Sequence, residues 1–219
     1  MEIYPLYHSG FFLALPHHYL LFDDYRGELP RLDPEIPLYV FVSHSHADHY
    51  RRDIVAVTSY YRHRTFLGSG IPDPVFLPVA PGDVLTPDDL TVTALPSTDE
   101  GVAFLVEVEG KTIFHAGDLH LWYWDDDTAE ERRDMERRYH AALEPLRGRA
   151  IDAAFLVLDS RQAEADALGG IAYFNDLTHT KAIFPMHAGD DTATMETRIP
   201  KLPRCDNIFF PWRHRVYEL

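Results

Sequence analysis

The sequence predicts a mixed protein of α-helices and β-strands, of the α+β or α/β class, and three observations carry this prediction. Short apolar runs are separated by Gly, Pro and Asp, a pattern typical of strands and turns. Segment 128–146 instead places its apolar residues at helical spacing along one face. Strands followed by a helix occur in each half of the chain, which favours sheets and helices packed in layers.

Composition limits the classes of protein that the chain can represent. With 219 residues and 46% hydrophobic residues, we expect a single domain, 1–219, with a substantial core. Cys205 is the sole cysteine, which excludes an intramolecular disulfide and a cysteine-based zinc cluster. The net charge of −15 argues against binding of long nucleic acid. No secretion-signal pattern or membrane-length apolar run is present, so we expect a cytoplasmic protein without a membrane partner.

The first half of the chain reads mainly as strands joined by short turns. Its expected strands cover 3–7, 11–15, 18–22, 37–42, 65–67, 75–79, 84–85 and 91–95. Segment 50–61 has the apolar spacing of a short helix packed on a sheet.

The second half combines a hairpin, helices and buried strands. Segments 102–108 and 111–115 flank Glu109-Gly110 and predict a β-hairpin. Thr128 and Glu131 form the capping box of the helix over 128–146. Helical structure is also expected over 192–201 and over parts of 162–181, with Gly169-Gly170 interrupting the latter. The remaining expected strands are 151–158, 182–186, 208–210 and 213–217.

A dense group of metal-ligand residues follows the apolar run 37–42. His44 and His46, two positions apart in an extended turn, can point at one metal ion. Asp48 and His49 are adjacent, so their side chains diverge and can serve a second metal nearby. The alternative is a polar turn that happens to be rich in histidine, but the order H-x-H-x-D-H is far more specific than a histidine pair.

This motif resembles the signature of the metallo-β-lactamase-fold hydrolases. The resemblance implies a four-layer αββα sandwich, in which two mixed β-sheets are flanked by helices, over essentially the whole chain. The short chain is similar to the branch that contains L-ascorbate 6-phosphate lactonase and other small metal-dependent hydrolases. We therefore expect neither the added nucleic-acid domain of the mRNA-processing relatives nor the fused flavin domain of the flavodiiron branch.

The resemblance also implies where the other metal ligands lie. His115-Ala116-Gly117-Asp118 follows a strand and matches the bridging-aspartate motif, so Asp118 is expected to bridge two metals. Phe184-Pro185-Met186-His187 matches the last ligand motif and assigns His187 to the second metal. The middle motif departs from the family, because no histidine lies between His63 and His115. Asp99 is the best substitute ligand there, whereas a turn, or hydroxyls that hold a water, are the alternatives.

Several residues are expected around the ligands rather than on the metals. Asp23, directly after a strand, matches the carboxylate that orients the histidine loop. His115 and His120 flank the bridging Asp118, and His120 is a fallback ligand. Trp122 belongs to an aromatic run that forms either a substrate wall or ordinary packing under the next helix. Asp159 ends a buried strand, and either faces the pocket or caps a loop.

These expectations combine into a hydrolase that uses two divalent metal ions, zinc first and manganese or iron(II) as alternatives. Metal-bound hydroxide would cleave a small ester, lactone or phosphodiester, with Asp48 as the catalytic residue that accepts or relays the proton. One alternative is a phosphodiesterase or nuclease of the same fold, and another is a metal-binding protein with little catalysis. The expected partner is a small-molecule substrate, and a homo-oligomer stays open.

Overall fold

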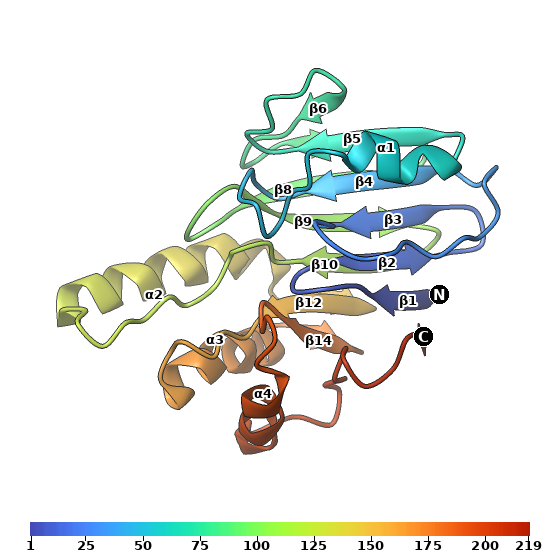
Figure 1. Cartoon of the computed structure of the whole chain (residues 1–219). Coiled ribbons are helices and arrows are strands. Elements are labelled where there is room, and N and C mark those ends of the chain that lie inside the picture. Colours follow the sequence, from blue (N-terminus) through green and yellow to red (C-terminus); the bar gives the residue numbers. More distant parts are fainter.

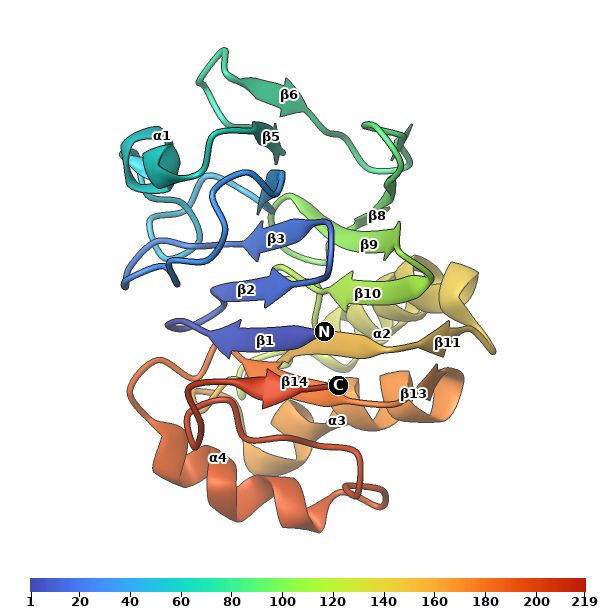
Figure 2. The same ribbon diagram turned by 90° about the vertical axis from the view of Figure 1, so that its right-hand side faces the viewer.

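Two mixed β-sheets lie face to face at the centre of the computed structural model, which describes residues 1–219. The strands of both sheets are seen together in Figure 2. The first sheet has seven strands, in the order β15-β1-β2-β3-β4-β5-β6. Their bounds are Glu2–Pro5 (β1), Phe11–Ala14 (β2), Tyr19–Phe22 (β3), Leu38–Val42 (β4), Arg64–Gly68 (β5), Phe76–Pro78 (β6) and Tyr217–Glu218 (β15).

The second sheet has six strands, in the order β14-β12-β10-β9-β8-β7. Their bounds are Val84–Leu85 (β7), Thr91–Pro96 (β8), Val102–Val108 (β9), Lys111–His115 (β10), Ala153–Val157 (β12) and Ile183–Met186 (β14). A separate pair joins β11 (Ala150–Ile151) and β13 (His179–Thr180). The hairpin of β9 and β10 has the bounds that the sequence predicts.

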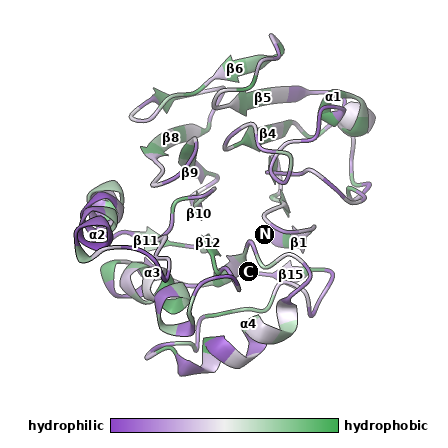
Figure 3. Ribbon diagram, turned by 60° about the vertical axis from the view of Figure 1, so that its left-hand side comes forward, coloured by the Kyte–Doolittle hydropathy of each residue, from purple (hydrophilic) through white to green (hydrophobic).

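Helices cover the outer faces of the two sheets. The helices are α1 (Ile54–Val57), α2 (Ala129–Leu143), α3 (Glu164–Leu177) and α4 (Thr192–Arg198). In Figure 3, α1 lies outside β4 and β5, whereas α2 and α3 lie outside the second sheet. This arrangement confirms the predicted αββα layers. No helix combines the length and the apolar character that crossing a membrane requires.

Apolar side chains fill the space between the layers. One cluster of 51 buried residues includes side chains from both sheets and from α2 and α3, and a second cluster of 11 lies under α1. Strands such as β4, whose five residues are all buried, read as continuous apolar runs because both of their faces are covered. The capping box of Thr128 and Glu131 begins α2 as predicted, and the helix is largely hydrophilic in Figure 3.

Three predicted elements differ in the structure. Helix α3 runs without a break through Gly169-Gly170, so the predicted interruption is wrong. A Cβ at Gly170 would lie 2.7 Å from Nδ1 of His120, and therefore these glycines let the helix approach its neighbours. The predicted strand 208–210 makes one isolated bridge with β14, and of 213–217 only Tyr217 belongs to a strand, β15, because the rest of both segments is irregular.

The register of the strands brings distant loops to one edge of the sandwich (Figure 1). Strands β10, β12 and β14 are parallel, so the residues that follow them, up to Asp118, Asp159 and His187, emerge at the same end. Strands β3 and β4 are parallel too, which places Asp23 beside the loop of His44. Functional residues concentrate at such carboxyl ends of parallel strands.

Candidate metal centre

The histidine loop, residues 43–49, follows β4 and packs against two glycines. Gly101 and Gly117 have φ angles of +69° and +52°, a left-handed region that favours glycine. A Cβ at Gly101 would overlap the carbonyl oxygen of Ser43, and one at Gly117 would lie 2.7 Å from Cβ of Ser43. The two glycines therefore allow the loops after β8 and β10 to reach the start of the histidine loop.

His44, His46 and Asp118 form the first group of metal-ligand side chains. Their ligand atoms all lie within 4.8 Å of one another. His44 is 3% exposed, and its Nε2 lies 3.3 Å from Oδ2 of Asp118. His46 is exposed and stands edge-on to His44, with ring centroids 4.5 Å apart. The group thus offers two imidazoles and one carboxylate on the side that faces solvent.

The second group contains Asp48, His49 and His187, and it also contains His8. The ligand atoms of these four residues lie within 4.8 Å of one another. His8 comes from the turn between β1 and β2, and its Nε2 is 3.6 Å from Oδ2 of Asp48. Sequence reasoning did not select His8, because a single histidine in a turn carries no ligand pattern.

Asp118 lies between the two groups. Its Oδ1 is 3.1 Å from Nε2 of His49 and 3.6 Å from Nε2 of His187, whereas its Oδ2 faces His44. Burial opposes ionisation of this carboxyl group, but His49 and the neighbouring histidines hold its pKa well below the usual range. Each oxygen of Asp118 therefore faces a different group, as a bridging ligand requires.

The buried atoms of this region lack ordinary hydrogen-bond partners. Nε2 of His8, His44 and His49 and Oδ1 of Asp118 are all buried and unpaired. Such groups are costly in a protein interior unless something satisfies them. Imidazole nitrogens and carboxylate oxygens that converge in this way fit divalent metal ions such as zinc, iron or manganese.

Comparison with known proteins supports the fold. No family model matches the sequence, and neither does any curated protein. A metallo hydrolase from the hyperthermophilic archaeon Ignicoccus hospitalis is 15% identical, with a TM-score of 0.62 over 100% of this chain and 98% of that chain. The metallo-β-lactamase fold protein YhfI from Bacillus subtilis is 15% identical, with a TM-score of 0.61 over 99% of each chain. The chain has the metallo-β-lactamase fold.

The same fold supports more than one chemistry. CmlA, a diiron β-hydroxylase from Streptomyces venezuelae, is 12% identical, with a TM-score of 0.66 over the whole chain. This chain spans about half of its length, since 53% of CmlA is covered. A metallo-β-lactamase fold therefore positions a site without defining its reaction, which depends on the residues in and around the metal groups.

Asp23 fixes the histidine loop through contacts with Ser43 and His49. Its Oδ1 accepts the backbone N–H of Ser43 at 2.7 Å, and its Oδ2 accepts the Ser43 hydroxyl at 2.6 Å. Nδ1 of His49 lies 2.8 Å from the same Oδ2, which directs Nε2 of His49 toward Asp118. Burial lowers the pKa of His49, but the nearby carboxylates of Asp118 and Asp23 outweigh burial and raise it to about 10. Metal binding at Nε2 must then displace a proton.

Asp159 supports His187 in the same manner. Its Oδ2 lies 3.0 Å from Nδ1 of His187, and its Oδ1 accepts the backbone N–H of Arg161 at 2.8 Å. Burial raises the pKa of Asp159, but His187 and Arg161 outweigh it and hold the pKa well below its usual range. Asp159 therefore closes its own loop, which is one of the two predicted roles, and it also orients His187, but it does not line the cleft.

His115 and His120 lie outside both groups. Nε2 of His115 is 2.9 Å from the carbonyl oxygen of Ser9, and its Nδ1 accepts the backbone N–H of Gly117. His115 therefore links the turn of His8 to the loop of Asp118. His120 is buried, and its Nε2 lies 2.8 Å from Oε1 of Gln162. The structure does not bring His120 to the metal groups as the fallback ligand.

Asp99 also lies outside both groups. It is exposed on the loop after β8, where its backbone N–H donates to the hydroxyl of Ser97. Its neighbour Thr98 is turned inward and donates its hydroxyl to the carbonyl oxygen of His120 at 2.6 Å. Asp99 lines the cleft in front of the first group, and its role as a replacement ligand stays a prediction.

A cleft of about 440 Å³ opens in front of the two groups. Trp122 and Trp124 form one wall, with their rings stacked at a centroid separation of 6.0 Å. Nε1 of Trp122 donates to the carbonyl oxygen of Asp118 at 2.9 Å, so the wall is tied to the bridging residue. The cleft is lined by His46, Asp48, Thr98, Asp99, Asp118, Trp122, Trp124, Asp127, Glu131, Met135, Arg161 and His187.

Asp24, next to Asp23, gives this region a pH-dependent stability. Its side chain is 0% exposed, its Oδ1 lacks a partner, and burial raises its pKa to about 6 despite Arg51 at 3.3 Å. Because the folded state then binds more protons than the unfolded state, stability falls as pH rises from about 4 to about 6, by about 3 kcal/mol.

We expect the metal-free Asp24→Asn variant to exceed the wild type in stability at about pH 7.5 and to match it closely at about pH 3.5. Urea unfolding of both proteins at the two pH values measures the difference. If the unfolding free energies of the two proteins differed equally at both pH values, the buried charge of Asp24 would not destabilise the fold.

Proposed function

We propose that the chain is a metal-dependent hydrolase that cleaves a small ester, lactone or phosphodiester at a site for two divalent metal ions. The observation that carries the proposal is Asp118, whose two oxygens face two separate groups of ligand side chains. The two imidazoles of the first group and the three of the second suit zinc, with manganese or iron(II) as alternatives. The metallo hydrolase from Ignicoccus hospitalis, which has a similar structure, supports the same class.

The residues of the centre have separate tasks in this reaction. When bound, divalent metals lower the pKa of a coordinated water into the neutral range and polarise the bond to be cleaved. Asp48, whose side chain is 49% exposed, is the carboxylate placed to accept a proton from a water in the cleft. Asp23 and Asp159 fix the ring directions of His49 and His187, so that both Nε2 atoms point at Asp118.

The cleft favours an ester or lactone over a phosphodiester. Its rim carries Asp99, Asp127 and Glu131, whereas the charge of Arg161 is paired with Asp159. Like charges at the rim oppose an anionic substrate. Trp122 and Trp124 offer a flat apolar wall for a ring or an acyl chain. A small uncharged molecule therefore suits the cleft better than a nucleic-acid strand.

Metal content and turnover test the proposal together. The protein is purified without added metal or chelator, its metals are counted by elemental mass spectrometry, and it is assayed on an aryl ester, a lactone and a bis-aryl phosphodiester. We expect two equivalents per chain, ester or lactone turnover that a chelator abolishes, and recovery when metal is restored. Turnover that survives metal removal would contradict the proposal, as would metal loading without any turnover.

The same measurement decides the role of Asp99. If Asp99 ligates the first metal, the Asp99→Ala variant loses one equivalent. If the variant keeps both equivalents, the first metal is held by His44, His46 and Asp118 alone.

A further inference from the structure

His8 is fixed in place by contacts that link three loops of the metal centre. It follows β1, with a φ angle of +60°, and its carbonyl oxygen accepts the backbone N–H of His187 at 3.2 Å. The next carbonyl oxygen, of Ser9, lies 2.9 Å from Nε2 of His115. The hydrogen bond from Gly10 N–H to the carbonyl oxygen of Tyr7 closes the turn. The backbone therefore presents His8 to the second group and holds it there.

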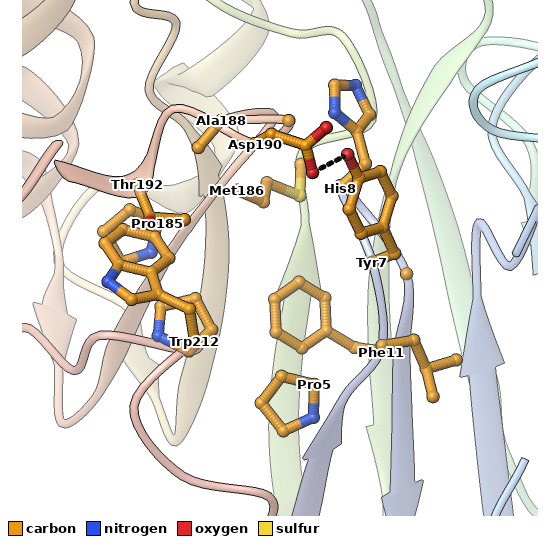
Figure 4. A pocket seen from close by; sticks show the side chains of 14 residues that line it. Pro5, Tyr7, His8, Phe11, Pro185, Met186, Ala188, Asp190, Thr192 and Trp212 are labelled. Atoms are coloured by element: carbon orange, nitrogen blue, oxygen red, sulfur yellow. Dashed lines mark hydrogen bonds between the residues drawn. The ribbon is translucent and has the colours of Figure 1, made fainter. Parts of the chain in front are cut away.

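The ring of His8 faces the ligands of the second group, although His8 also lines a neighbouring pocket together with Phe11 and Trp212. In Figure 4, the hydroxyl of Tyr7 donates a hydrogen bond to Asp190. The ring of His8 lies at the top of the view, away from Phe11 and Trp212. The side chain is 11% exposed, and its Nε2 is buried without a hydrogen-bond partner. Its ring centroid is 4.1 Å from that of His187 and 5.7 Å from that of His49.

We propose that His8 is a further protein ligand of the second metal, together with Asp48, His49, His187 and the bridging Asp118. The inference rests on the proposed function, because it presumes that these residues hold a metal. A bound cation would satisfy Nε2 of His8, which makes no hydrogen bond because Oδ2 of Asp48, at 3.6 Å, is too far away for one.

This assignment makes the two metal sites unequal. The second site has three imidazoles and its own carboxylate, whereas the first has two imidazoles, and both share Asp118. His8 thus adds an imidazole to the second site, whereas the missing middle histidine would have belonged to the first. We therefore expect the first equivalent of metal to occupy the second site.

Nuclear magnetic resonance of the wild-type protein tests the assignment directly. Protein with ¹⁵N-labelled histidine is loaded with one and then two equivalents of ¹¹³Cd, and ring nitrogens bonded to the metal show a scalar coupling. We expect coupling at His8, His49 and His187 with the first equivalent, and at His44 and His46 with the second. Coupling at His49 and His187 without His8 would overturn the inference and leave the proposed function standing. Coupling at no histidine would overturn both.

The His8→Asn variant assigns the His8 signal and gives a second readout. Asparagine tolerates a left-handed backbone, so the turn can keep its conformation. We expect affinity for the first zinc equivalent to fall by more than about 10-fold, since even partners of ligands affect affinity by 10–100-fold. The matched control is His63→Asn, which removes a histidine that is 62% exposed, and its affinity should equal that of the wild type.

Thermal unfolding of the metal-free proteins separates ligation from a structural role. If His8 is a ligand, its nitrogen has no partner without metal, so His8→Asn should unfold near the wild-type temperature. A lower unfolding temperature with unchanged zinc affinity would show that His8 serves the fold instead.

Discussion

Replacing Asp118 with alanine is expected to lower hydrolytic turnover by more than about 100-fold, because loss of a ligand should exceed the 10–100-fold effect of losing a ligand's partner. Asp118 is the one side chain that faces both ligand groups. Its removal leaves the first group with two imidazoles and takes the shared carboxylate from the second. Metal content should therefore fall below two equivalents per chain, which elemental mass spectrometry measures alongside turnover.

Asp127→Ala is the matched control for this prediction. Asp127 lines the same cleft but belongs to neither ligand group. This variant should keep both equivalents of metal, and its turnover should stay within the same order of magnitude as the wild type. If Asp118→Ala kept two metals and wild-type turnover, the bridging role would be wrong, and with it the two-metal site.

The residues that the sequence could place are those that directly follow a buried strand. Asp23, the histidine loop, Asp118 and His187 all come shortly after apolar runs that read as strands. Parallel pairing of β3 with β4, and of β10 with β12 and β14, then brings these strand ends to one edge. The resemblance to a known family assigned the roles of Asp23, Asp118 and His187, and the strand before each one determines where its side chain emerges.

His8 follows the expected strand 3–7, but the same reasoning could not select it, because a single histidine in a turn matches no ligand motif. Strand β2 runs antiparallel to β3, and Phe11 is paired with Phe22. The start of β2 therefore lies beside the end of β3, which places the turn of His8 next to Asp23. The position of His8 near the metal centre follows from the pairing register of β2 with β3. The residue pattern within each strand does not determine that register.

Contacts with other elements explain the remaining differences. The glycines of α3 suggested a break in the helix, whereas close approach of Gly170 to His120 and a hydrogen bond from Tyr139 to the Gly170 carbonyl accommodate them within it. The propensity of glycine to interrupt a helix is weak compared with tertiary packing. Contacts also decide the orientation of the loop of Asp99. Thr98 is turned inward by its hydrogen bond to the carbonyl oxygen of His120, and the carboxylate of Asp99 is left exposed.

Replacing Asp23 with asparagine is expected to weaken metal binding at the second site by about 10–100-fold while the fold is retained. Asparagine has the same shape and accepts a left-handed backbone, which Asp23 has at φ +42°. Its oxygen can still accept the N–H of Ser43. Its amide N–H₂, however, would face Nδ1 of His49 and make that nitrogen an acceptor.

The proton of His49 would then sit on Nε2, the atom that faces Asp118 and the metal, so the imidazole could not ligate without changing tautomer. Zinc affinity of Asp23→Asn, measured by competition with a chelator, checks this, and Asp53→Asn serves as the exposed control. Asp23→Ala should behave differently. It takes the carboxylate from the buried His49–Asp23 pair and leaves the N–H of Ser43 unpaired, which should cost about 3–5 kcal/mol of unfolding free energy. Unchanged zinc affinity in Asp23→Asn, with a stable fold, would show that His49 does not depend on Asp23 for its tautomer.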